Sequence, residues 1–250
     1  DRATWIAVNA DSMRALLDPA FARIAGERVH STAAAAIGGK VTGAEAGALL
    51  AFMASKVLGQ YDLAPDGTPA LMLVAPNILA VATELDVDLA DFRLWVCMHE
   101  ETHRVQFTAN PWLREHLITQ ARALAVDLAP DPERIAELTR SLSQRLPEAL
   151  GSGGLGVAGL FTTPEQRDRM AGRTAVMSLL EGHADVVMDD VGPTYIPSVA
   201  AIRAKFTERR KGAGAADRLL RRLLGLEAKM RQYRDGAAFV RAVQASVGVD

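Results

Sequence analysis

The stretch FRLWVCMHEETHRVQF, residues 92–107, decides the fold of this chain. Apolar residues stand on nearly every side of the segment before its histidines, which is typical of a buried helix. Asp88 or Asp91 could cap the start of this helix, and Asn110-Pro111 marks its end. We therefore predict a buried helix that begins near Asp88 or Asp91, ends at about Phe107, and forms the central element of the protein.

Two histidines in this helix are spaced for metal binding. His99 and His103 are four residues apart, so their side chains lie on one helix face and can bind one ion. Neutral imidazole is a good zinc ligand, and zinc accepts a tetrahedral site that leaves one position for water. Glu100 is rotated by about 100° from His99, which places its carboxylate beside the metal, where a general base can deprotonate zinc-activated water. The motif predicts a Zn²⁺ cofactor and a catalytic Glu100.

A third protein ligand has to come from elsewhere in the chain. Position 109, where the metzincin extension has a histidine, is alanine, which excludes that variant. The other main solution is a glutamate from a separate helix within an E-x-x-x-D pattern, and Glu181-Gly182-His183-Ala184-Asp185 fits it. Glu181 could bind zinc while Asp185, on the same face, accepts a hydrogen bond from the second ring nitrogen of His99.

His183 is the alternative third ligand. It is turned by about 200° from Glu181 on a regular helix, so only one of the two can face the ion. We favour Glu181, because only this choice gives Asp185 a role. An oxyanion donor is also expected near the metal, and the candidates for contacting oxyanion or substrate are His183, Tyr195 and Tyr61.

Alanine, leucine and arginine dominate the chain, and runs of β-branched residues are few, so the predicted fold class is mainly α, of the α+β type. Leu71–Val74 is the best strand candidate, and it could bind an extended peptide by backbone pairing. Further helices are predicted over Trp5–Leu17 (ending near Pro19), Thr42–Gly59, Pro76–Leu85, Leu113–Leu128, Pro132–Leu150, Pro164 to Leu180 or beyond (ending by Gly192-Pro193), and Ala215–Tyr233.

Length and composition limit the organisation and the setting. We expect one domain over residues 1–250, and the glycine-rich residues 151–159 are the clearest internal break, so two lobes would divide near 151–160. No stretch approaches the roughly 20 apolar residues that span a bilayer. The single cysteine, Cys97, fits a reducing compartment, and we expect a cytoplasmic protein. The first residue is not Met, so the sequence is expected to start inside a longer chain.

A net charge of -2 gives no reason to expect nucleic acid or a membrane as partner. The basic stretch Lys205–Arg234 is interpreted as the solvated face of an amphipathic helix. We interpret the G-x-G-x-x-G run at 151–156 as a loop, because it follows a helical segment instead of a strand.

The motif and its surroundings resemble a known family. Phe92-Arg93-Leu94-Trp95, His103-Arg104-Val105-Gln106-Phe107, Pro111-Trp112-Leu113-Arg114 and Leu180–Asp185 are similar to the zincin-like metallopeptidases common in actinobacteria, some of which are labelled as associated with deazaflavin-coenzyme biosynthesis. The resemblance implies a zincin-like fold, in which an active-site helix and a small sheet are surrounded by a helical bundle. It also implies a zinc hydrolase, but it supplies no substrate.

The leading hypothesis is a zinc metallopeptidase that cleaves a peptide or amide bond. The alternatives are a catalytically inactive binding or scaffold protein that keeps the zincin fold, and a metallohydrolase that acts on a small metabolite in coenzyme synthesis. The expected partner is a peptide or small-molecule substrate, and the oligomeric state is left open.

Overall fold

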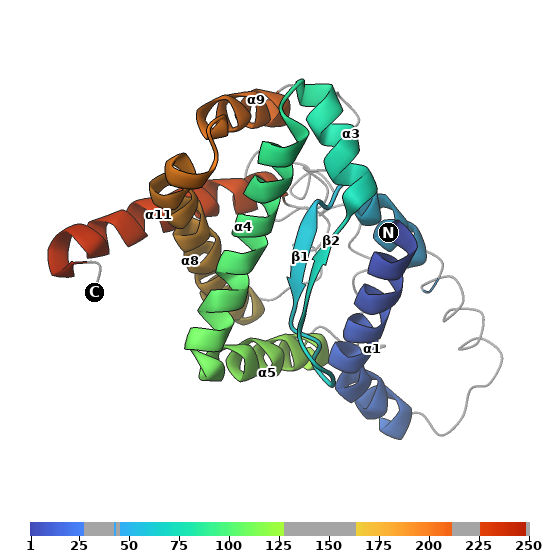
Figure 1. Cartoon of the computed structure of the whole chain (residues 1–250). Helices are drawn as coiled ribbons and strands as arrows, with labels where there is room; N and C mark the ends of the chain where they lie inside the picture. The colour runs from blue at the N-terminus through green and yellow to red at the C-terminus, as the bar shows by residue number, and fades with distance from the viewer. Residues whose placement is uncertain (28–42, 44–45, 128–163, 212–225, 249–250) are drawn as a thin grey trace, which may run out of the picture. The chain divides into compact units, whose positions relative to one another are not determined.

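A computed structural model describes residues 1–27, 43, 46–127, 164–211 and 226–248. The fold is mostly helical with one small two-stranded sheet, as the sequence predicts (Figure 1). The chain divides into two compact units. The first comprises Asp1–Val126 and Ile196–Ile202, and the second comprises Asp127–Tyr195 and Arg203–Asp250. No helix in the described ranges is both long enough and apolar enough to span a membrane.

The first unit contains the sheet and the motif helix. Its elements are α1 (Arg2–Glu27), a helix over 46–54, β1 (Gly59–Asp62), β2 (Ala70–Leu73), α3 (Ala75–Leu85), α4 (Leu89–Ala109) and α5 (Pro111–Asp127). Strands β1 and β2 are antiparallel, with Gly59 opposite Leu73 and Asp62 opposite Ala70. The hairpin lies between α4 and α1 (Figure 1), and both strands contact α4.

The core of this unit joins segments that are far apart in the sequence. Trp5, Leu50, Ala54 and Val74 form a buried apolar cluster, so α1 and the helix over 46–54 meet the residue after β2. Burial of such side chains contributes about 25 cal/mol per Å² of apolar surface. The cluster therefore anchors the end of the β1–β2 hairpin against α1 and the helix over 46–54.

Asn77 connects three segments of the first unit by hydrogen bonds. It is 2% exposed, and its amide donates to the carbonyls of Ala54 and Val57, each at 2.7 Å. Its Oδ1 accepts from Arg2 Nε at 2.7 Å. A buried amide must satisfy its donors and acceptor, and Asn77 does so by linking α3 to α1 and to the end of the helix over 46–54.

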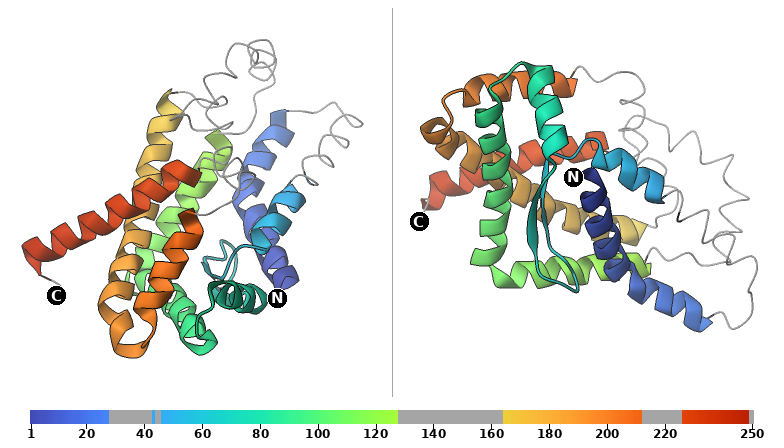
Figure 2. Two further views of the ribbon diagram at one scale, coloured as in Figure 1. Left: turned by 90° about the horizontal axis from the view of Figure 1, so that it is seen from above. Right: turned by 45° about the vertical axis from the view of Figure 1, so that its right-hand side comes forward.

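The second unit contains α8 (Pro164–Tyr195) and α11 (Leu226–Val247), which pack against one another (Figure 2). Glycines make the close approach of these two helices feasible. A Cβ on Gly182 would lie 2.3 Å from Ala237 N, and one on Gly236 would lie 2.0 Å from the carbonyl oxygen of Ser178. The two backbones are therefore in direct contact, which determines the face that α8 turns toward α11.

Arginines add polar links within the second unit. Arg203, on α9 (Val199–Lys211), donates to the carbonyl oxygen of Asp185 at 3.0 Å and forms an ion pair with Asp189. Arg241 on α11 donates to the second carboxylate oxygen of Asp189 at 2.9 Å. Asp189 thus bridges α9 and α11 from its place on α8.

Most element predictions are confirmed within a few residues. The strand predicted at Leu71–Val74 is β2, the helix predicted at Pro76–Leu85 is α3, and the helices predicted at Asp88–Phe107 and Leu113–Leu128 are α4 and α5. The helix predicted from Pro164 ends at Tyr195, two residues beyond Pro193.

Three boundaries are wrong. The first helix continues through Pro19 to Glu27, although a proline inside a helix removes one backbone hydrogen bond. The helix predicted to reach Gly59 ends at residue 54, because Gly59 begins β1. The last helix extends to Val247, well past Tyr233.

Several predictions lie outside the described residues. They are the start of the helix predicted at Thr42, the helix at Pro132–Leu150, the glycine-rich break near 151–160 with its G-x-G-x-x-G run, and the start of the last helix at Ala215. The prediction of one domain over 1–250 stays a prediction.

Candidate metal centre

Helix α4 is positioned by its cap and by its buried face. The Asp88 side chain accepts a hydrogen bond from the backbone N–H of Asp91 at 2.9 Å, so of the two predicted caps Asp88 is the one that forms. Phe92 is fully buried and Val96 is 2% exposed. Burial of this face one to two turns before the motif fixes the rotation of the helix that carries His99 and His103.

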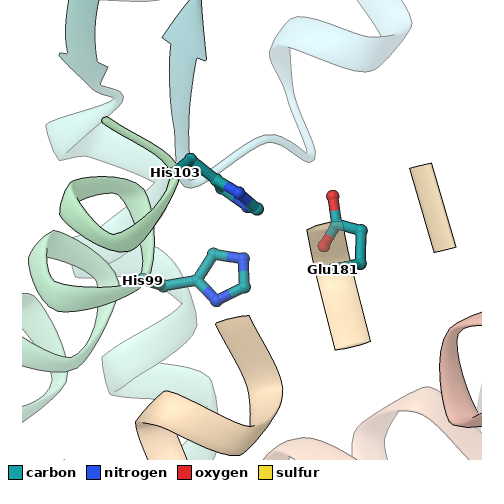
Figure 3. A group of neighbouring side chains, drawn as sticks. All are labelled: His99, His103 and Glu181. Atoms are coloured by element: carbon teal, nitrogen blue, oxygen red, sulfur yellow. The ribbon is translucent and has the colours of Figure 1, made fainter. Parts of the chain in front are cut away.

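The two histidines lie on one face, as their spacing predicts. Their ring centroids are 4.8 Å apart and the rings meet edge to face, at 86°. Ligand atoms of His99, His103 and Glu181 all lie within 4.8 Å of one another (Figure 3), and the three side chains are half-buried. Two imidazoles and one carboxylate are the donor set of many zinc sites with an open position for water. The group could therefore hold a metal ion, and zinc fits it.

Gln106 supports one of these histidines. Its Oε1 lies 3.0 Å from His103 Nδ1, and Gln106 is only 7% exposed. When Nδ1 carries the proton, it donates to this oxygen and Nε2 is left as the ligand atom. The H-E-x-x-H motif by itself predicts no role for Gln106. Its position three residues after His103, on the same helix face, was the available signal.

The two adjacent glutamates of the motif have different environments. Glu100 is 7% exposed, whereas the side chain of Glu101 is 46% exposed and forms an i,i+3 ion pair with Arg104. Arg104 Nε is 2.8 Å from both carboxylate oxygens of Glu101, and this hydrogen bonding lowers the pKa of Glu101. Glu101 is thus engaged at the surface, and Glu100 is the inward carboxylate of the motif.

Cys97 is a half-buried thiol two residues before His99. Burial is the largest effect and raises the pKa of this thiol, the Arg93 charge opposes it, and the Glu100 and Glu101 charges each add a smaller increase. A thiol with a raised pKa stays protonated at neutral pH and is a poor nucleophile. Cys97 is therefore better described as a partly buried packing residue than as a nucleophile.

The remaining predicted site residues lie on α8 and β1. His183 is half-buried two residues after Glu181, and Asp185 Oδ1 is 3.6 Å from Arg203 Nη1. Tyr195 ends α8 with 63% of its surface exposed. It stands 14 residues after Glu181, about 21 Å along a helix, and so lies much further along α8 from Glu181 than His183 does. The roles of these residues, including the contact between His99 and Asp185, stay predictions.

Tyr61 lies on β1, and its ring stacks on Phe107 at a centroid distance of 5.7 Å. Phe107 is four residues after His103, so Tyr61 flanks the face of α4 that carries the histidines. The sequence patterns do not predict β1. A four-residue strand that contains glycine and two polar residues gives little periodic signal.

Comparisons with known proteins identify the family of the chain. A family model described as zincin-like metallopeptidase matches residues 1–250. A crystal structure from Chloroflexus aurantiacus, described as a candidate hydrolase with a novel fold, is similar with a TM-score of 0.62 and 32% sequence identity. The similarity covers 100% of this chain and 68% of that one. No curated protein matches the chain.

The zincin-like family is confirmed over the whole chain. The actinobacterial distribution and the association with deazaflavin-coenzyme biosynthesis stay predictions. A zinc hydrolase in general is supported by the family and by the structural neighbour.

Proposed function

Because the chain belongs to the family of zincin-like metallopeptidases, we propose that it is a zinc-dependent hydrolase that cleaves a peptide or amide bond. The observation that carries this proposal is the convergence of His99, His103 and Glu181, with ligand atoms within 4.8 Å of one another. Glu100, buried one residue after the first ligand, supplies the base that such a reaction needs.

The proposed division of labour is simple. His99 and His103 would bind zinc through ring nitrogens and Glu181 through a carboxylate oxygen, with Gln106 orienting His103. Zinc, when bound, would acidify water and polarise the substrate carbonyl. A carboxylate oxygen of Glu100 would accept a proton from the attacking water and then donate it to the leaving amine nitrogen. We assign His183, on the same helix as Glu181, the further role of polarising the substrate carbonyl.

The test of this mechanism uses Glu100→Gln. The amide keeps the size of the carboxylate but cannot serve as a base, so hydrolysis of a quenched-fluorescent mixed peptide library should fall by 10²-fold or more. Zinc content, measured by plasma mass spectrometry, should remain at one ion per chain. Undiminished hydrolysis by Glu100→Gln would contradict the mechanism.

Two other outcomes would redirect the proposal. Turnover of components in a metabolite extract, without cleavage of any peptide, would favour a hydrolase for small molecules in coenzyme synthesis. A folded, zinc-free wild-type protein without any turnover would favour the binding or scaffold protein. The control is Thr108→Ala, an exposed position on α4 whose hydroxyl donates to two carbonyls of its own helix, at 2.9 and 3.3 Å.

A further inference from the structure

Gly59, the first residue of β1, lies directly against the side chain of Glu100. A Cβ built on Gly59 would stand 2.5 Å from Glu100 Cγ, 2.8 Å from Oε1 and 2.9 Å from Cδ. Carbon atoms in contact normally stand about 3.5–4.0 Å apart. The Glu100 side chain therefore occupies the space that any side chain at position 59 would fill.

The need for glycine at this position is steric and not conformational. Gly59 does not have a positive φ, since Gly248 is the one glycine with a positive φ among the described residues. Alanine can thus adopt the backbone conformation of residue 59 without strain. What it cannot do is share the space with the Glu100 side chain.

The backbones on both sides of this contact are fixed. Gly59 is paired with Leu73, and Val74 N donates to Leu58 O at 2.8 Å directly beside it. On the other side, α4 is fixed by buried Phe92 and Val96. The Glu100 side chain is the part that can move, so a methyl group at position 59 would displace the carboxylate and leave strand and helix in place.

We propose that Gly59 is a positioning residue: because it has no side chain, the Glu100 carboxylate can lie directly against β1. The contact between the two residues can be tested without any assumption about activity. The catalytic consequence rests on the proposed function, in which Glu100 is the base.

The contact is tested by introducing Gly59→Ala into three zinc-loaded backgrounds, namely wild type, Glu100→Gln and Glu100→Ala. Glutamine keeps the atoms that collide with a methyl group, and alanine removes all three of them. Thermal unfolding followed by circular dichroism should show Gly59→Ala lowering the midpoint by about 2–4 °C in the first two backgrounds. It should leave the midpoint of the Glu100→Ala background unchanged.

The matched control is Gly67→Ala, in the link between β1 and β2. A Cβ there would meet Ala64 Cβ at 3.5 Å, an ordinary contact, so this substitution should give no such pattern. Equal shifts from Gly59→Ala in all three backgrounds, or no shift in any, would overturn the proposal.

The catalytic arm separates this inference from the proposed function. Because a misplacement of about 1 Å can cost about 10²-fold in rate, Gly59→Ala should lower kcat by about that factor. KM and zinc content should stay at wild-type values, and Gly67→Ala should be fully active. If the wild type is active and Gly59→Ala keeps full kcat, the positioning role of Gly59 is refuted, whereas the proposed hydrolase function is not affected. If the wild type shows no hydrolysis, the proposed function is refuted, and the unfolding experiment still tests whether Gly59 and Glu100 are in contact.

Discussion

The amide oxygen of Gln106 lies 3.0 Å from Nδ1 of His103, on the same face of α4. With the proton on Nδ1, this hydrogen bond leaves Nε2 of His103 as the ring nitrogen that can bind a metal. Both residues belong to one helix, so the arrangement depends little on the rest of the fold. It leads to the first of four predictions.

Gln106→Ala should weaken zinc binding by about 10- to 100-fold, because His103 would lose the partner that fixes its tautomer and ring orientation. The measurement is competition with a chromophoric chelator at neutral pH. Thr108→Ala, at an exposed position of the same helix, should bind zinc like the wild type. Unchanged affinity in Gln106→Ala would mean that the hydrogen bond does not support the metal.

The choice of third ligand can be made by comparing two substitutions on α8. Glu181→Ala should abolish stoichiometric zinc binding, since two imidazoles alone make a weak site. His183→Ala should keep one zinc per chain and lower only turnover, because His183 is expected to contact the substrate. The measurement is metal content after dialysis. The reverse pattern would identify His183 as the ligand.

Gly182 and Gly172, both on α8, should respond in opposite directions to alanine. Gly182→Ala should lower the free energy of unfolding by at least about 1–3 kcal/mol. The reason is that its Cβ would lie 2.3 Å from the backbone nitrogen of Ala237 on α11. A Cβ on Gly172 meets nothing within 4 Å, so Gly172→Ala should stabilise the helix by up to about 1 kcal/mol. Urea titration measures both. A stabilising Gly182→Ala would contradict the observed packing of α8 on α11.

Asn77→Ala should destabilise the first unit strongly. It removes two hydrogen bonds of 2.7 Å to the carbonyls of Ala54 and Val57, and each buried carbonyl left without a partner costs about 1–3 kcal/mol. Thr83→Ala is the control on the same helix, because its exposed hydroxyl bonds only the Leu79 carbonyl. Its effect should stay within about 0.5 kcal/mol. If denaturant unfolding gives similar free energies of unfolding for the two variants, the hydrogen bonds of Asn77 do not stabilise the first unit.

Local sequence rules succeeded where the determinants are local. The Asp88 cap, the helix from Leu89 to Ala109 and the shared face of His99 and His103 all follow from contacts within one or two helical turns. The same rules failed at Pro19, where the helix continues to Glu27. They also failed at β1, because its four residues show little apolar alternation and become a strand by pairing with β2.

The sequence by itself determined the chemistry of the motif, since two imidazoles and a glutamate at H-E-x-x-H spacing lie at set angles on any regular helix. It also singled out Glu181 as a candidate ligand. Only the tertiary structure brought a ligand atom of Glu181 within 4.8 Å of those of the histidines and placed Gly59 against Glu100. These relations join residues about 40 to 80 positions apart. They depend on how helices and strands pack, which the 3.6-residue period of a helix does not encode.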